Sequence, residues 1–251
     1  MTGCCDRRCV ALRYIDFHAH ILPGIDDGAA NLAISRGLLL SQKAQGVATV
    51  VATPHFRKHD SVTAFVKVRE KALQQIREGI TEPIPDIVLA AEVEFYYGIS
   101  KRKNLRQLAI GNTDYILVEM PFTYWNDWFY DELDEIRRVH GLRPIVAHLD
   151  RYADTPERIK NFVKLFERDV LVQINADALL RFWPRRVVKK LLTWDAFNVL
   201  GSDCHDLDKR SCRFEKACEV IQKRFGVQML DKLMQNSEDI LQNRYVKRNQ
   251  D

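Results

Sequence analysis

The chain has 251 residues and a mass of 29.2 kDa, with 46% hydrophobic and 29% charged residues, a balance typical of globular proteins that excludes a disordered chain. Its 38 basic and 34 acidic side chains leave a net charge of +4, too mild an excess to indicate a nucleic-acid-binding protein. No apolar run reaches the roughly 18 residues of a membrane span, and the first 20 residues do not read as a signal peptide, which predicts a cytoplasmic protein without direct membrane insertion.

The first residues differ in character from the rest of the chain. Cys4, Cys5 and Cys9 stand among arginines with no hydrophobic periodicity, and none of the six cysteines forms the C-x-x-C spacing of a zinc site. We therefore expect residues 1–13 to form a flexible leader. No linker, low-complexity tract or repeat interrupts residues 14–251, so we expect them to form a single domain.

Short apolar, β-branched segments recur along this domain. Several are continuous apolar runs, as expected of strands that are covered on both faces. The predicted strands are, in chain order, Tyr14–Phe17, Ala48–Ala52, Ile87–Ala91, Tyr115–Val118, Pro144–Ala147, Val170–Ile174 and Asn198–Leu200.

Longer segments with helical periodicity separate the strands, and three of them stop at a glycine, a common signal for the end of a helix. The predicted helices are Asn31–Gln45, Ser61–Glu78, Asp127–His140, one that begins at Thr155-Pro156, Arg185–Thr193, Lys209–Phe225 and Gln228–Gln242. Strand–helix alternation predicts a parallel sheet with right-handed crossovers. Seven such units in this length favour a closed or nearly closed TIM-like (β/α) barrel, within the α/β class, over an open sheet.

Histidines and acidic residues follow these strands, at or just past their carboxyl ends. Five of the chain's seven histidines are among them. A parallel barrel gathers the carboxyl ends of its strands on one face, so we expect these side chains to converge. The candidates are His18, His20, Asp27, His55, Glu92, Glu119, His148, Asp203 and His205.

So many imidazoles and carboxylates at one end of the barrel need positive charge to offset the acids, and divalent metal ions provide it. In the segment His18-Ala19-His20, both rings lie on one side of an extended strand because residues i and i+2 share a face. Mixed nitrogen and oxygen donors suit zinc, manganese or iron better than calcium. The sequence therefore predicts a divalent metal site at this end of the barrel.

A second motif suggests a different chemistry. Cys204 to Arg210 reads C-x5-R, the formal signature of cysteine-dependent tyrosine phosphatases. That chemistry needs a thiolate at the centre of a loop of backbone N–H groups, usually with glycines. The intervening residues His-Asp-Leu-Asp-Lys include two acids and no glycine, so we predict that Cys204 is not the nucleophile.

Six segments carry a family resemblance: YIDFHAHILPGIDDG, VVATPHF, IVLAAEVE, ILVEMP, PIVAHLDRY and VLGSDCHDLDKR. They closely resemble the polymerase-and-histidinol-phosphatase (PHP) superfamily and, more narrowly, its protein-tyrosine-phosphatase branch from bacterial capsule and exopolysaccharide operons. The resemblance runs from about residue 14 to residue 243 and implies the PHP fold, a distorted seven-stranded barrel, with three metal ions. The long leader before the first strand departs from the family pattern.

The resemblance also implies a ligand set for each ion. The first ion takes His18, His20, Glu92 and Asp203, with Glu92 bridging to the second. The second takes Glu92, Glu119 and His148, and the third takes Asp27, His55 and His205. Glu94, two residues past Glu92, stays open as an alternative ligand. Manganese is the expected ion, and iron, zinc and magnesium are compatible with the same donors.

The implied activity is that of a metal-dependent phosphoric monoester hydrolase of the protein-tyrosine-phosphatase type, with a metal-activated hydroxide as nucleophile. The implied partner is the phosphotyrosyl tail of a bacterial tyrosine autokinase of capsular or exopolysaccharide biosynthesis. Arg151 and Arg210 stand where the family places arginines that grip the phosphoryl group; the alternative for each is a structural salt bridge. A small-molecule phosphatase such as histidinol-phosphatase, or another PHP phosphoesterase, is the alternative activity. Oligomerisation is left open.

An aromatic loop, residues 122–130, follows the fourth predicted strand and should lie at the rim of the mouth. Two interpretations carry equal weight. The loop is either a platform for a phosphotyrosine ring or kinase tail, or a hydrophobic cover or subunit contact.

Overall fold

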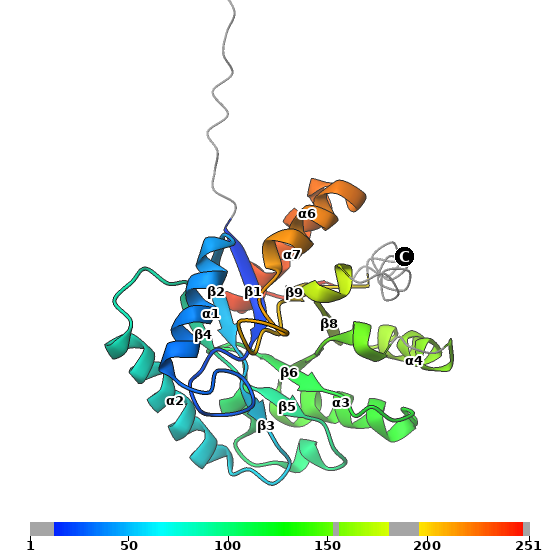
Figure 1. Ribbon diagram of the computed structural model, residues 1–251. Helices are drawn as coiled ribbons and strands as arrows, with labels where there is room; N and C mark the ends of the chain where they lie inside the picture. Colours follow the sequence, from blue (N-terminus) through cyan, green and yellow to red (C-terminus); the bar gives the residue numbers. More distant parts are fainter. Residues whose placement is uncertain (1–12, 153–155, 181–195, 248–251) are drawn as a thin grey trace, which may run out of the picture.

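The computed structural model describes residues 13–152, 156–180 and 196–247 (Figure 1). Within these ranges the strands pair in parallel, in two sheets with the orders β1-β2-β4 and β3-β5-β6-β7-β8-β9. The strands are β1 (Tyr14–Ala19), β2 (Val47–Ala52), β3 (His55–Phe56), β4 (Asp86–Leu89), β5 (Glu92–Glu94), β6 (Tyr115–Glu119), β7 (Arg143–Val146), β8 (Leu171–Asn175) and β9 (Val199–Gly201).

The two sheets meet at two breaks. One lies between β2 and β3, just past the predicted strand Ala48–Ala52, and the other lies between β4 and β5, at the end of the predicted strand Ile87–Ala91. Pro54 lies between β2 and β3, where its missing N–H breaks the regular hydrogen-bond ladder. Backbone hydrogen bonds nevertheless continue across the gap, from Ala90 N to Ala52 O (2.8 Å) and from Glu92 N to Pro54 O (3.1 Å). The strands therefore form one curled surface, and His55 and Glu92 are the first residues beyond its two breaks.

The first and last strands also approach each other. Asp203 N donates to His18 O (2.7 Å), and His20 N donates to Cys204 O (3.0 Å). These bonds place the segment after β9 beside the end of β1, although the two strands come from opposite ends of the sequence (Figure 1). The result is a mixed α/β fold with a curled parallel sheet, which agrees with the predicted class.

Side chains that alternate along the strands divide into two buried clusters. Leu117, Ile145, Leu171 and Val199 pack inside the curl, together with Phe17. Their neighbours along the same strands pack on the outer side, against the helices: Ile116, Val118, Val146, Val172 and Leu200. Burial on both faces explains the continuous apolar runs that predicted these strands.

The helices are α1 (Leu32–Ala44), α2 (Val62–Gly79), α3 (Asp127–His140), α4 (Pro156–Phe166), α6 (Phe214–Phe225) and α7 (Val227–Leu241). Predicted boundaries hold where a capping residue is present. Asn31 accepts from two backbone N–H groups at the start of α1, and Gly141 ends α3 with a φ of 64°. Among the described residues, no helix combines the length and apolar character that crossing a bilayer requires.

One helix boundary was predicted wrongly. The segment Lys209–Phe225 was expected to be helical throughout, but α6 begins only at Phe214. The Asp206 side chain accepts hydrogen bonds from the backbone of Asp208 and Arg210, which holds the preceding segment in a turn. The predicted helix Arg185–Thr193 and residues 1–12 of the predicted leader lie outside the described residues. The single-domain assignment of residues 14–251 stays a prediction.

Candidate active site

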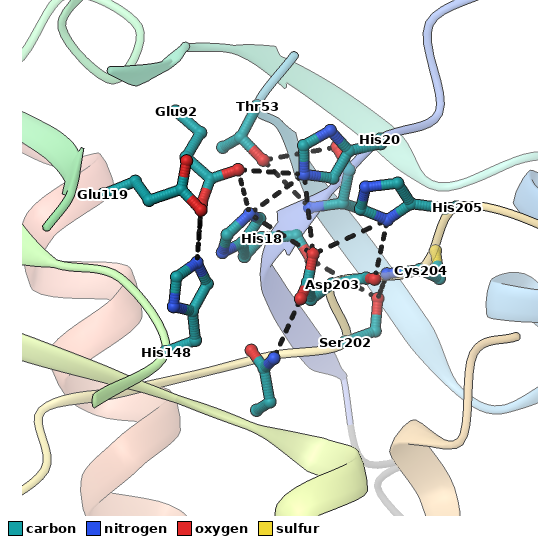
Figure 2. A network of polar contacts seen from close by, with 12 residues as sticks. His18, His20, Thr53, Glu92, Glu119, His148, Ser202, Asp203, Cys204 and His205 are labelled. Carbon is teal, nitrogen blue, oxygen red and sulfur yellow. Dashed lines mark hydrogen bonds and ion pairs between the residues drawn. The ribbon is translucent and has the colours of Figure 1, made fainter. Parts of the chain in front are cut away.

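The nine predicted ligands lie together at the carboxyl ends of the strands, and Figure 2 shows most of them around one centre. His18 is the fifth residue of β1, and His20 follows directly after that strand. Both rings point into the same space, as the i, i+2 spacing predicts, and their Nε2 atoms lie 3.1 Å apart. The other candidates reach this space from the ends of the neighbouring strands.

Glu92, the first residue of β5, lies at the centre of the cluster. Its Oε2 atom is 3.2 Å from Nε2 of both His18 and His20 and 3.0 Å from Nδ1 of His55. Its Oε1 atom is 2.7 Å from Nε2 of His148. The residue is only 1% exposed, yet Oε2 has no partner with hydrogen-bond geometry among the described residues. A buried carboxylate oxygen that faces three imidazole nitrogens in this way fits a bridging metal ligand.

The donor atoms form three overlapping groups, which share Glu92, His20 and His55. Within each group they lie within 4.8 Å of one another. Two donors about 2.1 Å from one ion would span up to about 4 Å, so small side-chain movements would bring each group onto an ion. The groups are His18, His20 and Glu92; His55, Glu92 and Glu119; and His20, Asp27, His55 and His205.

Asp203 and His148 lie next to the first two groups. Asp203 Oδ1 is 3.5 Å from His20 Nε2 and 3.7 Å from His18 Nε2. His148 Nε2 is 3.5 Å from Glu119 Oε1. Both residues therefore lie beside the donor groups of the ions to which the resemblance assigns them.

The third group lies nearest the solvent. Asp27 Oδ1 is 3.4 Å from His55 Nε2 and 3.7 Å from His205 Nε2. The Asp27 side chain is 61% exposed, whereas His205 is buried. The structure thus brings together the three residues that the resemblance assigns to a third ion.

The sequence analysis did not single out the residues that orient these ligands. Asp26 Oδ2 accepts from His20 Nδ1 at 2.7 Å, and Gln173 Oε1 lies 3.1 Å from His18 Nδ1. The Asn175 amide donates to Asp203 Oδ2 at 2.9 Å. Such contacts fix the tautomer and orientation of metal ligands. Their signal is two polar residues on one face of an otherwise apolar strand, Gln173 and Asn175.

The backbone around the site is unusual at two candidate ligands. His148 has a φ of 33° and Asp203 a φ of 54°, both in the left-handed region that residues with a Cβ rarely adopt. Gly201 lets its strand approach closely, since a Cβ there would lie 2.5 Å from the Cβ of His18. These positions turn the chain sharply at the strand ends, where the side chains must face the centre.

The electrostatics of the cluster favour positive charge at its centre. Burial alone would raise the pKa of Glu92, but the charge of His18 and the hydrogen bond from His148 hold this pKa well below its usual range. Burial disfavours a charged His20, yet its contacts with Asp26 and Glu92 raise its pKa to about 10. The Glu92 carboxylate is therefore ionised at neutral pH and attracts cations. This donor set fits divalent metal ions.

His205 differs from the other histidines. Burial, followed by the charge of His20, lowers its pKa to about 3. This direction favours the neutral imidazole, the form that can donate a lone pair to an ion. Its Nε2 atom is buried and has no hydrogen-bond partner among the described residues, so the lone pair is available to an ion.

Arg151 and Arg210 both reach the cluster through Asp203. The Arg151 guanidinium pairs with Asp203 Oδ2. Arg210 Nη2 lies 3.2 Å from Asp203 Oδ1, and Arg210 Nη1 lies 3.4 Å from Asp27 Oδ2. The two guanidinium groups thus stand at one side of the ligand cluster. Their side chains are about one third exposed, so part of each group faces solvent and is accessible to substrate.

Cys204 does not have the surroundings of a nucleophile. The residue is fully buried, and burial raises the pKa of its thiol well above the usual range. Its Sγ atom lies 3.6 Å from the amide of Gln42, on the side of α1. A buried thiol that keeps its proton is a poor nucleophile, which agrees with the prediction that Cys204 does not carry the chemistry.

Glu94, the alternative to Glu92, points elsewhere. Its Oε2 atom accepts a hydrogen bond from the backbone N–H of Lys58 at 2.8 Å. It belongs to none of the three donor groups. The geometry therefore favours Glu92 as the ligand at this strand end.

We expect Asp26→Asn to lower the affinity for metal by about 10- to 100-fold, the usual cost of losing a carboxylate that orients a ligating histidine. The amide cannot accept equally well from His20 Nδ1 and the backbone N–H of His55, which now share Asp26 Oδ2. Metal titration followed by calorimetry measures the change. Asp114→Asn, at an exposed ion pair with Arg106, is the matched control and should leave metal affinity unchanged.

Comparison with known proteins agrees with this geometry. Residues 14–242 match the family described as capsular polysaccharide synthesis, CpsB/CapC. The chain is 30% identical to the tyrosine-protein phosphatase YwqE of Bacillus subtilis, over 92% of this chain and 93% of the relative. It is 29% identical to the tyrosine-protein phosphatase CpsB of Streptococcus pneumoniae, over 87% and 94%.

A solved structure of two such phosphatases has a similar fold. A chain from the crystal structures of YwqE and CpsB, described as unique metal-dependent tyrosine phosphatases, superposes with a TM-score of 0.79 at 25% identity. The match covers 94% of this chain and 97% of that one. The family resemblance inferred from the motifs is thereby confirmed, and the chain belongs to the CpsB/CapC family of capsular polysaccharide synthesis proteins.

Proposed function

We propose that this protein is a metal-dependent protein-tyrosine phosphatase that hydrolyses phosphotyrosine on the tail of a bacterial tyrosine autokinase of capsular or exopolysaccharide synthesis. The observation that carries the proposal is the convergence of nine histidine and acidic side chains, among them the buried Glu92. Membership of a family whose relatives are named tyrosine-protein phosphatases supports the same activity. The cytoplasm, where such a kinase tail would be phosphorylated, is the proposed location.

Three divalent ions are proposed for the cluster, with manganese the expected metal and iron, zinc and magnesium as alternatives. The three donor groups support the number. We assign His18, His20, Glu92 and Asp203 to the first ion, Glu92, Glu119 and His148 to the second, and Asp27, His55 and His205 to the third. For the fold we propose a distorted (β/α)7 barrel, with the hydrogen bonds between the ends of β1 and β9 as the closing contact.

Divalent cations, when bound, supply Lewis acidity: they neutralise phosphoryl charge and make water a nucleophile at neutral pH. The chain's own residues supply orientation. Asp26 holds the His20 ring in position, and Gln173 holds the His18 ring. Arg151 and Arg210 offer guanidinium groups that grip two phosphoryl oxygens each and neutralise charge during transfer.

Different parts of the aromatic loop, residues 122–130, fit the two interpretations of it as a hydrophobic cover and as a platform for the substrate. Trp125 and Phe129 are buried, and the Trp125 indole donates to Pro121 O at 3.1 Å, so this part covers the core. Phe122 and Tyr124 are 51% and 67% exposed, and the Phe122 ring lies 4.9 Å from that of Tyr152. The exposed part remains a proposed platform for the substrate ring or tail.

Hydrolysis of a phosphotyrosyl peptide, measured beside histidinol phosphate and a phosphodiester on one metal-analysed sample, tests the proposed function. We expect the peptide to give the highest kcat/KM. Preference for histidinol phosphate would favour the small-molecule phosphatase, and preference for the diester would favour another phosphoesterase. Either result would contradict the proposed substrate while leaving the metal site intact.

A further inference from the structure

A small cationic pocket adjoins the ligand cluster. Its volume is about 50 Å³, and two elements bring most of its charged side chains together: the short helix Leu149–Tyr152 and the turn that precedes α6. The charged residues that line it are Arg151, Lys209, Arg210, Arg213, Asp177 and Asp203.

This pocket is distinct from the proposed metal centre. Of the nine candidate ligands, only Asp203 lines it. Arg151 and Arg210 also line it and both contact Asp203, so the pocket shares one wall with the ligand cluster. A group held at the Lys209 and Arg213 side of the pocket would thus lie next to a phosphoryl group that the two arginines grip.

The outer side of the pocket carries positive charge that the proposed chemistry does not use. The charge of Arg213 is partly offset by Asp177, since Arg213 Nη1 lies 3.5 Å from Asp177 Oδ1. Lys209 is exposed and has no ion-pair partner among the described residues. The turn capped by Asp206 fixes the backbone of this segment, so Lys209 is held beside Arg210. The pocket therefore presents four cations against two acids, one of which already contacts both arginines.

We propose that this pocket binds the carboxylate of an acidic residue that flanks the phosphotyrosine in the substrate peptide. The inference rests on the proposed function. The space open to the centre of a water-sized sphere is about 50 Å³, several times the roughly 10–15 Å³ that one water needs, so the pocket admits a small anionic head such as a carboxylate. Lys209 and Arg213 would contact the carboxylate, and charge at the rim of an interface acts on partner choice and association rate.

The test compares three phosphotyrosyl peptides that differ only near the phosphotyrosine: one with neutral neighbours, one with glutamates on both sides, and one with a second phosphotyrosine. We expect kcat/KM to be about fivefold higher for the glutamate peptide than for the neutral one, the scale of an exposed charge pair. The advantage should shrink at high salt. Lys209→Glu should remove or invert it, and so should the double variant Lys209→Ala/Arg213→Ala. Lys216→Glu, at an exposed lysine of α6 outside the pocket, is the matched control and should keep it.

Equal kcat/KM values for the neutral and glutamate peptides, or an advantage that survives in Lys209→Glu, would overturn the inference. A preference for the doubly phosphorylated peptide over the glutamate peptide would also overturn it, because the pocket would then accept a larger anion. These outcomes leave the proposed function standing. If none of the three peptides is hydrolysed by the metal-loaded protein, the proposed function itself is wrong.

Discussion

Removal of divalent cations should lower the hydrolysis of a phosphotyrosyl peptide by several orders of magnitude, and added Mn²⁺ should restore it. The reason is that the described site offers a set of metal ligands and no accessible thiol: Glu92 is ionised, and Cys204 is buried with a raised thiol pKa. Chelation followed by dialysis and metal analysis measures the effect. Magnesium, zinc and iron added back separately would rank the ions.

A cysteine variant provides the second half of this test. Cys204→Ser should keep most of the activity, since the thiol faces Gln42 and not the ligand cluster. Cys212→Ser, at another buried cysteine, controls for the cost of placing a hydroxyl in the core. If Cys204→Ser loses its activity while its metal content and folding stay normal, the metal-dependent mechanism is wrong.

Replacement of Arg151 or Arg210 by alanine should lower kcat/KM roughly 30- to 1,000-fold. This corresponds to a loss of about 2–4 kcal/mol of transition-state stabilisation, the scale for losing a preorganised donor. Lysine should rescue either variant only in part, because a point charge cannot reproduce the two-pronged contact with phosphate. Steady-state kinetics should show the loss mainly in kcat, since the charge on the phosphoryl oxygens changes during transfer.

The contact of both arginines with Asp203 makes metal analysis essential in this experiment. Normal metal content with low turnover supports a direct role on the phosphoryl group. Metal loss in parallel with turnover would show that the arginines act by holding Asp203. Arg106→Ala removes an exposed arginine that pairs with Asp114, and it should change neither quantity.

Much of the fold and site could be predicted from the sequence because both follow from short, local patterns. Strands buried on two faces appear as continuous apolar runs, as Leu171 and Val172 illustrate by packing on opposite sides. The parallel topology then places every strand end at one edge, so His18 and His148 could be expected to meet although 130 positions separate them. Their rings indeed lie 5.7 Å apart.

Other features could not be predicted because they depend on contacts between distant parts of the chain. The late start of α6 reflects the turn capped by Asp206, which competes with a segment of good helical periodicity. Gln173 gave only a weak signal, since its partners His18 and His148 come from other strands. The cationic pocket forms only when Arg151 is brought beside Lys209 and Arg213 in three dimensions.

The left-handed backbone at His148 and Asp203 has a consequence for the lifetime of the protein in the cell. Each such residue costs roughly 1–2 kcal/mol of folding stability, and a metal-free chain bears this cost in addition to a crowded set of buried acids. Metal binding to the folded state alone would offset it, by about 4 kcal/mol at a free concentration 1,000 times the dissociation constant. We therefore expect the metal-free protein to be less stable than the metal-loaded one and, in a cell, to be degraded faster.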